Sequence, residues 1–276
     1  MRLVLFHIVM LAVVSVSAQS TVIPDSVFER HLIDLGVDSG IPDGSVLTAN
    51  ISSVTSLSML FLDISDLTGI EDFSSLKTIL CSYTLLNKID FSQNLSLSSI
   101  AVHNNDLDTL ILPLSDSLVL LNCGNNELTE LTVSQYPKLE IIYCINNLIT
   151  HLDFSQNTQL HTAQVYNNPL VCFSIRNGNN LNLISFGGGN SPDLLCIEVD
   201  SADWFAANWA WGDPVVFSNN CGDNCTGVGV GVLEEILKPR VLIKIIDLMG
   251  NESLPRKNCF LIYLYDNGTY EKIYHF

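Results

Sequence analysis

Leucine recurs at a fixed interval of 21 residues through the middle of this chain. The leucines of this series are Leu76, Leu97, Leu118, Leu139, Leu160 and Leu181. A period of this length is typical of solenoids, in which each repeat forms one coil and the coils stack. One such coil is too small to bury its own apolar side chains. The stacking of neighbouring coils must therefore close a continuous core between them.

Other positions of the repeat, counted from each leucine as position 1, are equally regular. Apolar residues occupy position 4 (Ile79, Ile100, Leu121, Ile142), position 6 (Cys81, Val102, Cys123, Cys144, Val165) and position 11 (Leu86, Leu107, Leu128, Ile149, Leu170), and asparagine occupies position 9 (Asn105, Asn126, Asn147, Asn168). This spacing is the leucine-rich repeat pattern. The asparagine is expected at a turn, because its side chain can pair with backbone groups that a buried turn leaves unpaired. We predict a leucine-rich repeat solenoid over residues 54–193, built from short parallel β-strands, mostly coil and few helices.

An apolar segment at the start of the chain predicts export. It holds one charge, Arg2, followed by an apolar run over residues 3–16 and small residues before Gln19. These flanks fit a cleaved signal peptide over residues 1–18. The alternative is a membrane anchor, which needs about 20 apolar residues. We therefore expect no membrane span after signal removal, and a protein that is secreted or lies on the outer cell surface.

The repeats are flanked by segments that fit caps. Residues 19–53 hold a predicted amphipathic helix, with Asp25 as its N-cap, an apolar face made by Phe28, Leu32 and Leu35, and Glu29 and Arg30 facing water. Residues 194–226 abandon the period and contain all three tryptophans, within 203–211. Solenoids need such elements, because a bare terminal coil exposes the core.

Seven of the eight cysteines occupy two settings, the repeats and the region where the repeats degrade. Three of them stand at position 6 of the repeat: Cys81, Cys123 and Cys144. Valine takes the same position in other coils, which predicts buried free thiols. A disulfide between Cys123 and Cys144 is the alternative, since neighbouring coils lie about 4.8 Å apart. Where the repeats degrade, we expect a disulfide between Cys196 and Cys221 in an oxidising compartment. A metal knuckle at Cys221 and Cys225 is a weaker reading, because no second Cys or His pair accompanies it.

Charge separates the end of the chain from the repeats. Residues 19–237 hold 5 lysines and arginines and 25 aspartates and glutamates, a net charge of −20, whereas residues 238–276 hold 6 and 4, a net charge of +2. The glycines at 227–231 favour a linker over 227–237 rather than a nucleotide loop, since no strand precedes them and the third glycine of the dinucleotide pattern is missing. In residues 238–276, apolar stretches at 241–248, 259–265 and 270–276 with a turn signal at 266–268 predict a small β module.

The sequence contains none of the motifs that place a nucleophile, an acid or a metal. H-E-x-x-H, G-x-S-x-G and Walker patterns are missing, and the carboxylates are spread over solvent-facing positions. We therefore expect no enzyme activity, no cofactor and no metal site; an unrecognised hydrolase would need a cleft that a solenoid does not obviously provide. The acidic charge also repels phosphate, which argues against nucleic acid as a partner.

The candidate binding residues lie on the outward side of the strands. Because side chains alternate along a strand, positions 3, 5 and 7 of each coil point outward. An aromatic and apolar patch is predicted there from His103, Ile141, Tyr143, Ile145 and Tyr166. Such patches mark recognition surfaces and Tyr is a common interface anchor, although exposed apolar residues are also ordinary strand formers.

Most of the chain after residue 18 resembles known proteins. The 21-residue coils, together with the motifs at 24–29, 67–73 and 196–200, resemble exported bacterial leucine-rich repeat proteins of the internalin-like, cysteine-ladder type. The final module, with its motifs at 243–250 and 263–268, is similar to the C-terminal sorting domain of type IX secretion cargo, although it lacks the early Asn-Pro strand. The resemblance implies that the signal peptide directs the protein across the inner membrane and the tail directs it across the outer membrane, after which such tails are usually removed. Surface attachment through the tail is the alternative.

The expected function is recognition outside the cell. We expect a leucine-rich repeat protein that binds an extracellular protein or glycan through its outward strand face. The alternative is a structural or adhesive component of a surface matrix without a single ligand.

Overall fold

The computed structural model of the protein describes residues 19–222, 242–247, 254, 259–265 and 270–275. The chain divides into two compact units, Met1–Cys221 and Gly222–Phe276. The predicted signal peptide at 1–18 and the predicted linker at 227–237 lie outside the described residues.

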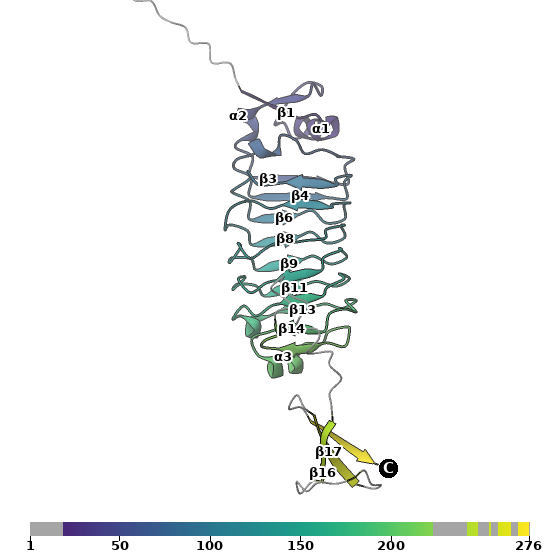
Figure 1. The fold of residues 1–276 in the computed structure, drawn as a ribbon. Helices are drawn as coiled ribbons and strands as arrows, with labels where there is room; N and C mark the ends of the chain where they lie inside the picture. Colours follow the sequence, from purple (N-terminus) through teal and green to yellow (C-terminus); the bar gives the residue numbers. More distant parts are fainter. Residues whose placement is uncertain (1–18, 223–241, 248–253, 255–258, 266–269, 276) are drawn as a thin grey trace, which may run out of the picture. The chain divides into compact units, whose positions relative to one another are not determined.

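The first unit is a stack of coils whose strands form a seven-stranded parallel sheet (Figure 1). In spatial order the strands are β13 (Ser185–Gly187), β11 (Thr162–Gln164), β9 (Ile141–Tyr143), β8 (Leu120–Asn122), β6 (Ser99–Ala101), β4 (Thr78–Ser82) and β3 (Ser56–Leu60). Equivalent repeat positions pair with one another, since Leu121 lies beside Ile100 on one side and Ile142 on the other. The predicted leucine-rich repeat solenoid is confirmed.

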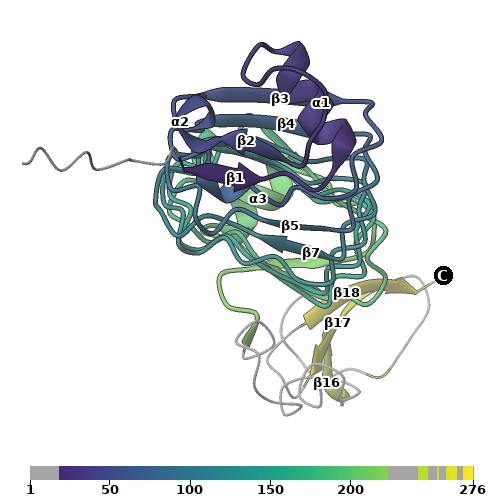
Figure 2. The same ribbon diagram turned by 90° about the horizontal axis from the view of Figure 1, so that it is seen from above.

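Further three-residue strands make a second face on the same coils. They are β5 (Lys88–Asp90), β7 (Thr109–Ile111), β10 (His151–Asp153), β12 (Cys172–Ser174), β14 (Cys196–Glu198) and β15 (Val216–Ser218). β5 pairs with β7, and the other four form a separate parallel sheet. Figure 2 looks along the stack and shows β5 and β7 across the coil from β3 and β4. The core lies between these two faces.

The apolar repeat positions fill that core. The residues predicted at positions 4, 6 and 11 are all buried, and so are the first five leucines of position 1. Each fully buried side chain of this size contributes about 1.5–3 kcal/mol relative to an exposed one.

The sixth leucine does not follow the prediction. Leu181 is 71% exposed, and Leu183 is buried in its place. The cause is a 3-10 turn, η2 (Asn180–Asn182), which lengthens this coil. Gln164 consequently pairs with Gly187 rather than with Ser185.

The asparagines of position 9 pair with backbone groups at a turn, as predicted, and their bonds also join adjacent coils. Asn126 Nδ2 donates to the carbonyls of Val102 and Cys123, both at 3.0 Å, and its Oδ1 accepts the N–H of Leu107 at 3.1 Å. The same pattern recurs at Asn147 and Asn168. These bonds satisfy backbone groups that burial at the turn would otherwise leave unpaired.

An N-terminal cap covers the first coil. It consists of β1 (Ser20–Val22), α1 (Ser26–Asp34), β2 (Ser45–Leu47) and α2 (Thr48–Ile51), and β1 pairs antiparallel with β2. η1 (Ile70–Asp72) lies in the coil that follows β3. Asp25 is the N-cap of α1, as predicted, because its Oδ1 accepts the N–H groups of Val27 and Phe28 at 2.9 and 3.0 Å.

Two expectations for α1 were wrong. Glu29 does not face water: it is buried, and its carboxylate accepts the N–H groups of Asp43 and Gly44 at 2.6 and 2.8 Å. Leu35 does not join Phe28 and Leu32 on the buried face, because the helix ends at Asp34 and leaves Leu35 exposed at the C-cap.

A C-terminal cap closes the other end of the stack. It contains α3 (Ala202–Asn208), whose Phe205 is buried. The Trp211 ring lies 5.7 Å from Phe173 and 5.9 Å from Phe186, measured between ring centroids. The tryptophan-rich segment therefore packs on the core, as a cap must.

The predictions for Cys196, Cys221 and the cysteines of position 6 are confirmed. Cys196 and Cys221 form a disulfide with a Cα–Cα distance of 5.8 Å. Cys172 is also disulfide-bonded. The cysteines of position 6 are buried free thiols: Cys81, Cys123 and Cys144.

The second unit contains an antiparallel sheet. Its strands are β16 (Leu242–Asp247), β17 (Cys259–Tyr265) and β18 (Tyr270–His275), with β17 in the middle. They match the three predicted strands, while the turn signal at 266–268 lies outside the described residues. Across the described part of both units, no helix has the length and apolar character needed to cross a membrane.

Candidate functional site

The outward side of the seven-stranded sheet carries the predicted binding residues. Four of them lie on two adjacent coils: Ile141, Tyr143 and Ile145 on the coil of β9, and Tyr166 on the coil of β11. Gln164 lies beside Tyr143 in the register, which places Tyr166 diagonally from Tyr143 on the same face. Tyr166 is 41% exposed, and the other three are half-buried. We call these four residues the tyrosine patch.

A glycine on the next coil makes room for Tyr166. A Cβ atom at Gly187 would lie 2.4 Å from Tyr166 Oη and 2.6 Å from Gln164 Oε1. Gln164 is itself held in place, because its Nε2 donates to Ser185 Oγ at 2.8 Å. The Tyr166 ring therefore packs over Gly187 and occupies the space that a side chain at position 187 would need.

Ile145 makes a similar approach at the other end of the tyrosine patch. A Cβ atom at Gly124 would lie 3.0 Å from Ile145 Cγ1. The apolar surface of the patch thus extends over the coil of β8.

His103 does not join the tyrosine patch. The coil of β8, with Gly124, lies between His103 and Ile145. His103 Nδ1 instead lies 3.1 Å from Ser82 Oγ, and its ring meets the Tyr83 ring edge-on at 5.8 Å. Burial lowers the pKa of His103 below its ordinary value of 6.5, which favours the neutral imidazole.

The sequence prediction missed two exposed aromatic residues that stack on each other, one of which, Tyr83, contacts His103. Phe61 is 71% exposed and Tyr83 is 47% exposed, and their rings stack with centroids 4.5 Å apart. Both have left-handed backbones, with φ of 57° and 58°, which bulky residues seldom adopt. Both stand at position 8 of their coils, where the following coils carry asparagine. An aromatic residue in an asparagine column is the signal that identifies them.

The rest of position 8 is a ladder of asparagine side chains with left-handed backbones. Its members are Asn104, Asn125, Asn146, Asn167 and Asn190. From Asn125 onward, each Oδ1 accepts a hydrogen bond from the Nδ2 of the asparagine on the next coil. Asparagine tolerates this backbone conformation because its short polar side chain can bond locally. The strand face is therefore bordered by stacked aromatics near β3 and β4 and by stacked amides along the tyrosine patch.

In the described residues, no cluster of three or more His, Cys, Asp or Glu side chains could hold a metal ion. The tyrosine patch offers instead a rigid surface with apolar area and phenol hydroxyls, which suits non-covalent recognition.

No protein-family model and no curated protein matches this chain. Several solved structures are similar to it at low sequence identity. The functional domain of InlJ from Listeria monocytogenes, which includes a cysteine ladder, is 16% identical, with 91% of this chain and 97% of that chain covered and a TM-score of 0.41. An internalin, InlF, from Listeria monocytogenes is 14% identical over 71% of each chain, with a TM-score of 0.45. A leucine-rich repeat protein of Leptospira interrogans is 15% identical over 62% of this chain and 45% of that chain, with a TM-score of 0.44. The fold assigned above rests on the register of the coils themselves.

Proposed function

We propose that this protein acts outside the cell and binds a protein or glycan through its outward strand face. The observation that carries the proposal is the juxtaposition of Tyr143 and Tyr166 on adjacent coils, beside Ile141 and Ile145. Tyrosine contributes a large contact area with few rotatable bonds, so little conformational entropy is lost when a partner binds. A sheet whose strands are fixed by stacking keeps the two rings in place before the partner arrives.

Export and attachment belong to the same proposal. The sequence of residues 1–18 supports a signal peptide, and the disulfide between Cys196 and Cys221 suits an oxidising compartment. Residues 238–276 would then serve as a sorting module of the type IX kind, through which the protein reaches or stays on the outer surface. Partner binding requires no catalysis and no cofactor.

The test is capture of a partner followed by substitution of the tyrosine patch. The chain beginning at Gln19 is used as bait in extracellular material, and the affinity of the captured partner is then measured. Tyr143→Ala combined with Tyr166→Ala is expected to weaken binding about 10-fold or more, the loss of an anchor worth about 1.4 kcal/mol or more. The melting temperature should change little, because neither ring is fully buried.

Two further variants sharpen this test. Gly187→Ala leaves both tyrosines in the chain but displaces the Tyr166 ring, so it should also weaken binding. Leu148→Ala removes an exposed apolar side chain outside the tyrosine patch and should leave binding unchanged. Equal affinity of the double tyrosine variant and the parent would show that the patch is only strand-forming. Self-association that none of these variants alters would favour the structural role in a surface matrix.

A further inference from the structure

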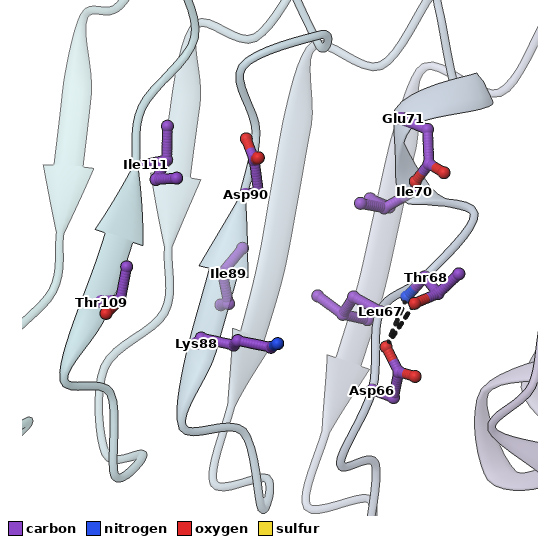
Figure 3. A pocket seen from close by; sticks show the side chains of 10 residues that line it. All are labelled: Asp66, Leu67, Thr68, Ile70, Glu71, Lys88, Ile89, Asp90, Thr109 and Ile111. Atoms are coloured by element: carbon purple, nitrogen blue, oxygen red, sulfur yellow. Dashed lines mark hydrogen bonds between the residues drawn. The ribbon is translucent and has the colours of Figure 1, made fainter.

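A pocket opens on the second face of the coils, away from the tyrosine patch (Figure 3). It lies where the segment 66–71 passes beside β5, and its volume is about 360 Å³. Pockets that hold ligands span roughly 300–1,000 Å³. Three largely buried side chains form its apolar floor: Leu67, Ile70 and Ile89.

The strand β5 presents an unpaired edge to this pocket. The Phe91 N–H donates to the Ile111 carbonyl at 2.9 Å, which sets the phase of the ladder between β5 and β7. Alternate residues of a parallel strand point their backbone groups to opposite sides. The N–H and C=O groups of Lys88 and Asp90 therefore point away from β7, toward the segment 66–71. Within residues 19–222, no backbone hydrogen bond joins Lys88 or Asp90 to that segment.

The segment 66–71 does not pair with this edge of β5, because its own backbone groups form local hydrogen bonds. The Thr68 N–H donates to Asp66 Oδ1 at 2.8 Å, and the Gly69 N–H donates to Glu71 Oε2 at 2.9 Å. Gly69 has φ of 98°, and a Cβ atom there would lie 2.6 Å from the Val22 carbonyl oxygen of the N-terminal cap. The segment is thus held in a turn against the cap instead of extending along β5.

Charge around the pocket favours a cationic ligand. The carboxylates of Asp66, Glu71 and Asp90 line it, and Lys88 is the lysine among its lining residues. Figure 3 shows the Lys88 side chain extending from β5 toward the segment 66–71. In the described part of the chain, Lys88 forms no salt bridge. The full chain carries a net charge of −17, which attracts basic partners over a longer range.

We propose that this pocket, which we call the β5 groove, binds one extended peptide segment with basic side chains. The segment adds as a strand to the edge of Lys88–Asp90, and its backbone satisfies the free N–H and C=O groups there. Because strand side chains alternate, one set rests on the apolar floor and the other reaches the carboxylates. The β5 groove is a separate site from the tyrosine patch, so either assignment can fail without the other.

A labelled peptide of three Lys-Val repeats is the probe, measured by fluorescence anisotropy with the chain that begins at Gln19. Saturable binding is expected, and a peptide of the same sequence with N-methylated amides should bind about 10-fold more weakly or worse, since it lacks N–H donors. This comparison uses the unaltered protein, so it does not depend on the folding of any variant.

Matched substitutions locate the site. Lys88→Pro removes the N–H that faces the groove and leaves the ladder to β7 intact, as proline is tolerated at such edges. It should reduce affinity about 10-fold or more, whereas Lys88→Val, which keeps the N–H, should not weaken binding.

Asp90→Asn should reduce affinity about threefold. Asp153→Asn is its control, because Asp153 Oδ1 accepts the Ser155 N–H at 2.8 Å as Asp90 Oδ1 accepts the Ser92 N–H at 2.8 Å, yet it lies outside the groove.

The outcomes that overturn the proposal are equally specific. Absence of binding at about 1 mM peptide would refute the proposal. The dissociation constant would then exceed about 1 mM, which is weaker than a specific site gives. Equal binding of the N-methylated peptide, or equal affinity of the Lys88→Pro and Lys88→Val variants, would show that no strand is added. An Asp153→Asn effect as large as that of Asp90→Asn would reduce the binding to general attraction between a basic peptide and an acidic protein.

Discussion

Position 6 of the repeat accepts cysteine and valine alike, because any small apolar side chain fits there between the two faces of the coil. Burial raises the pKa of Cys81 and Cys123 to about 12. Burial, followed by the neighbouring Cys123, raises the pKa of Cys144 well above its ordinary value. The thiolate is the reactive form, so these thiols are inert while the coil is folded.

Alkylation tests whether the thiols of position 6 are free and protected by burial. In the native protein near pH 8, iodoacetamide should leave Cys81, Cys123 and Cys144 unmodified, and after denaturation without reductant it should label all three. Peptide mapping reads the result, with Cys196 and Cys221 as the internal control, because their disulfide should block labelling until reductant is added. A peptide in which Cys123 is joined to Cys144 would contradict the free-thiol assignment.

At the scale of elements, Asp25 connects the N-terminal cap to the first coil. Its Oδ1 caps α1, while its Oδ2 accepts the N–H groups of Ser65 and Asp66 at 2.8 and 3.2 Å. Burial alone would raise the pKa of Asp25, but the hydrogen bonds from Ser65, Phe28 and Val27 outweigh it and hold the pKa below 3.8. The carboxylate therefore stabilises the fold when it is ionised.

Asp25→Asn separates the two roles of this side chain. Asparagine still caps α1, but its amide nitrogen faces donors where Oδ2 accepted them, so we expect a loss of about 1–2 kcal/mol in unfolding free energy near pH 7. A lowered folded-state pKa gives stability that is complete above the unfolded-state pKa and lost as the pH falls through the folded-state pKa. Urea unfolding of parent and variant should thus differ most above about pH 5 and converge as the pH falls below 3.8 and through the lowered folded-state pKa. A difference independent of pH would show that the charge of Asp25 does not matter.

At the scale of the whole solenoid, each coil is held by its neighbours. The core runs without interruption from the cap residue Phe28 to Phe205 of α3. In such stacks, stability is a sum of coil and interface contributions, so damage in a middle coil weakens the contacts on both sides of it.

Leu128→Asp tests this coupling and the assigned register. Leu128 is fully buried, so the change removes its apolar burial and buries an unpaired charge, at a cost of at least about 3 kcal/mol. We expect a large drop in melting temperature, measured by circular dichroism. Leu148→Asp is the control, since Leu148 is 51% exposed and should tolerate the charge. Similar melting temperatures for both variants would mean that the register is wrong.

The repeat period alone determined most of the interior. Because each coil places the same position in the same surroundings, a residue such as Leu121 or Asn126 could be assigned to the core or to a turn from its position number. The strand alternation likewise predicts that Tyr143 and Tyr166 lie on one face. These features follow from contacts between equivalent residues one period apart. Such contacts require similar residues at the same position of each repeat, so they appear in the sequence as a periodic pattern.

Only the tertiary structure decided the features that break the period. Glu29 is buried because the loop at 43–44 presents two N–H groups to it, and Leu181 is exposed because η2 lengthens its coil. His103 lies apart from the tyrosine patch, and its ring contacts the Tyr83 ring, which in turn stacks on the Phe61 ring. The edge of β5 is open because Gly69 is held against the cap. Each of these depends on a contact between residues that are not equivalent in the repeat, and periodicity carries no information about such contacts.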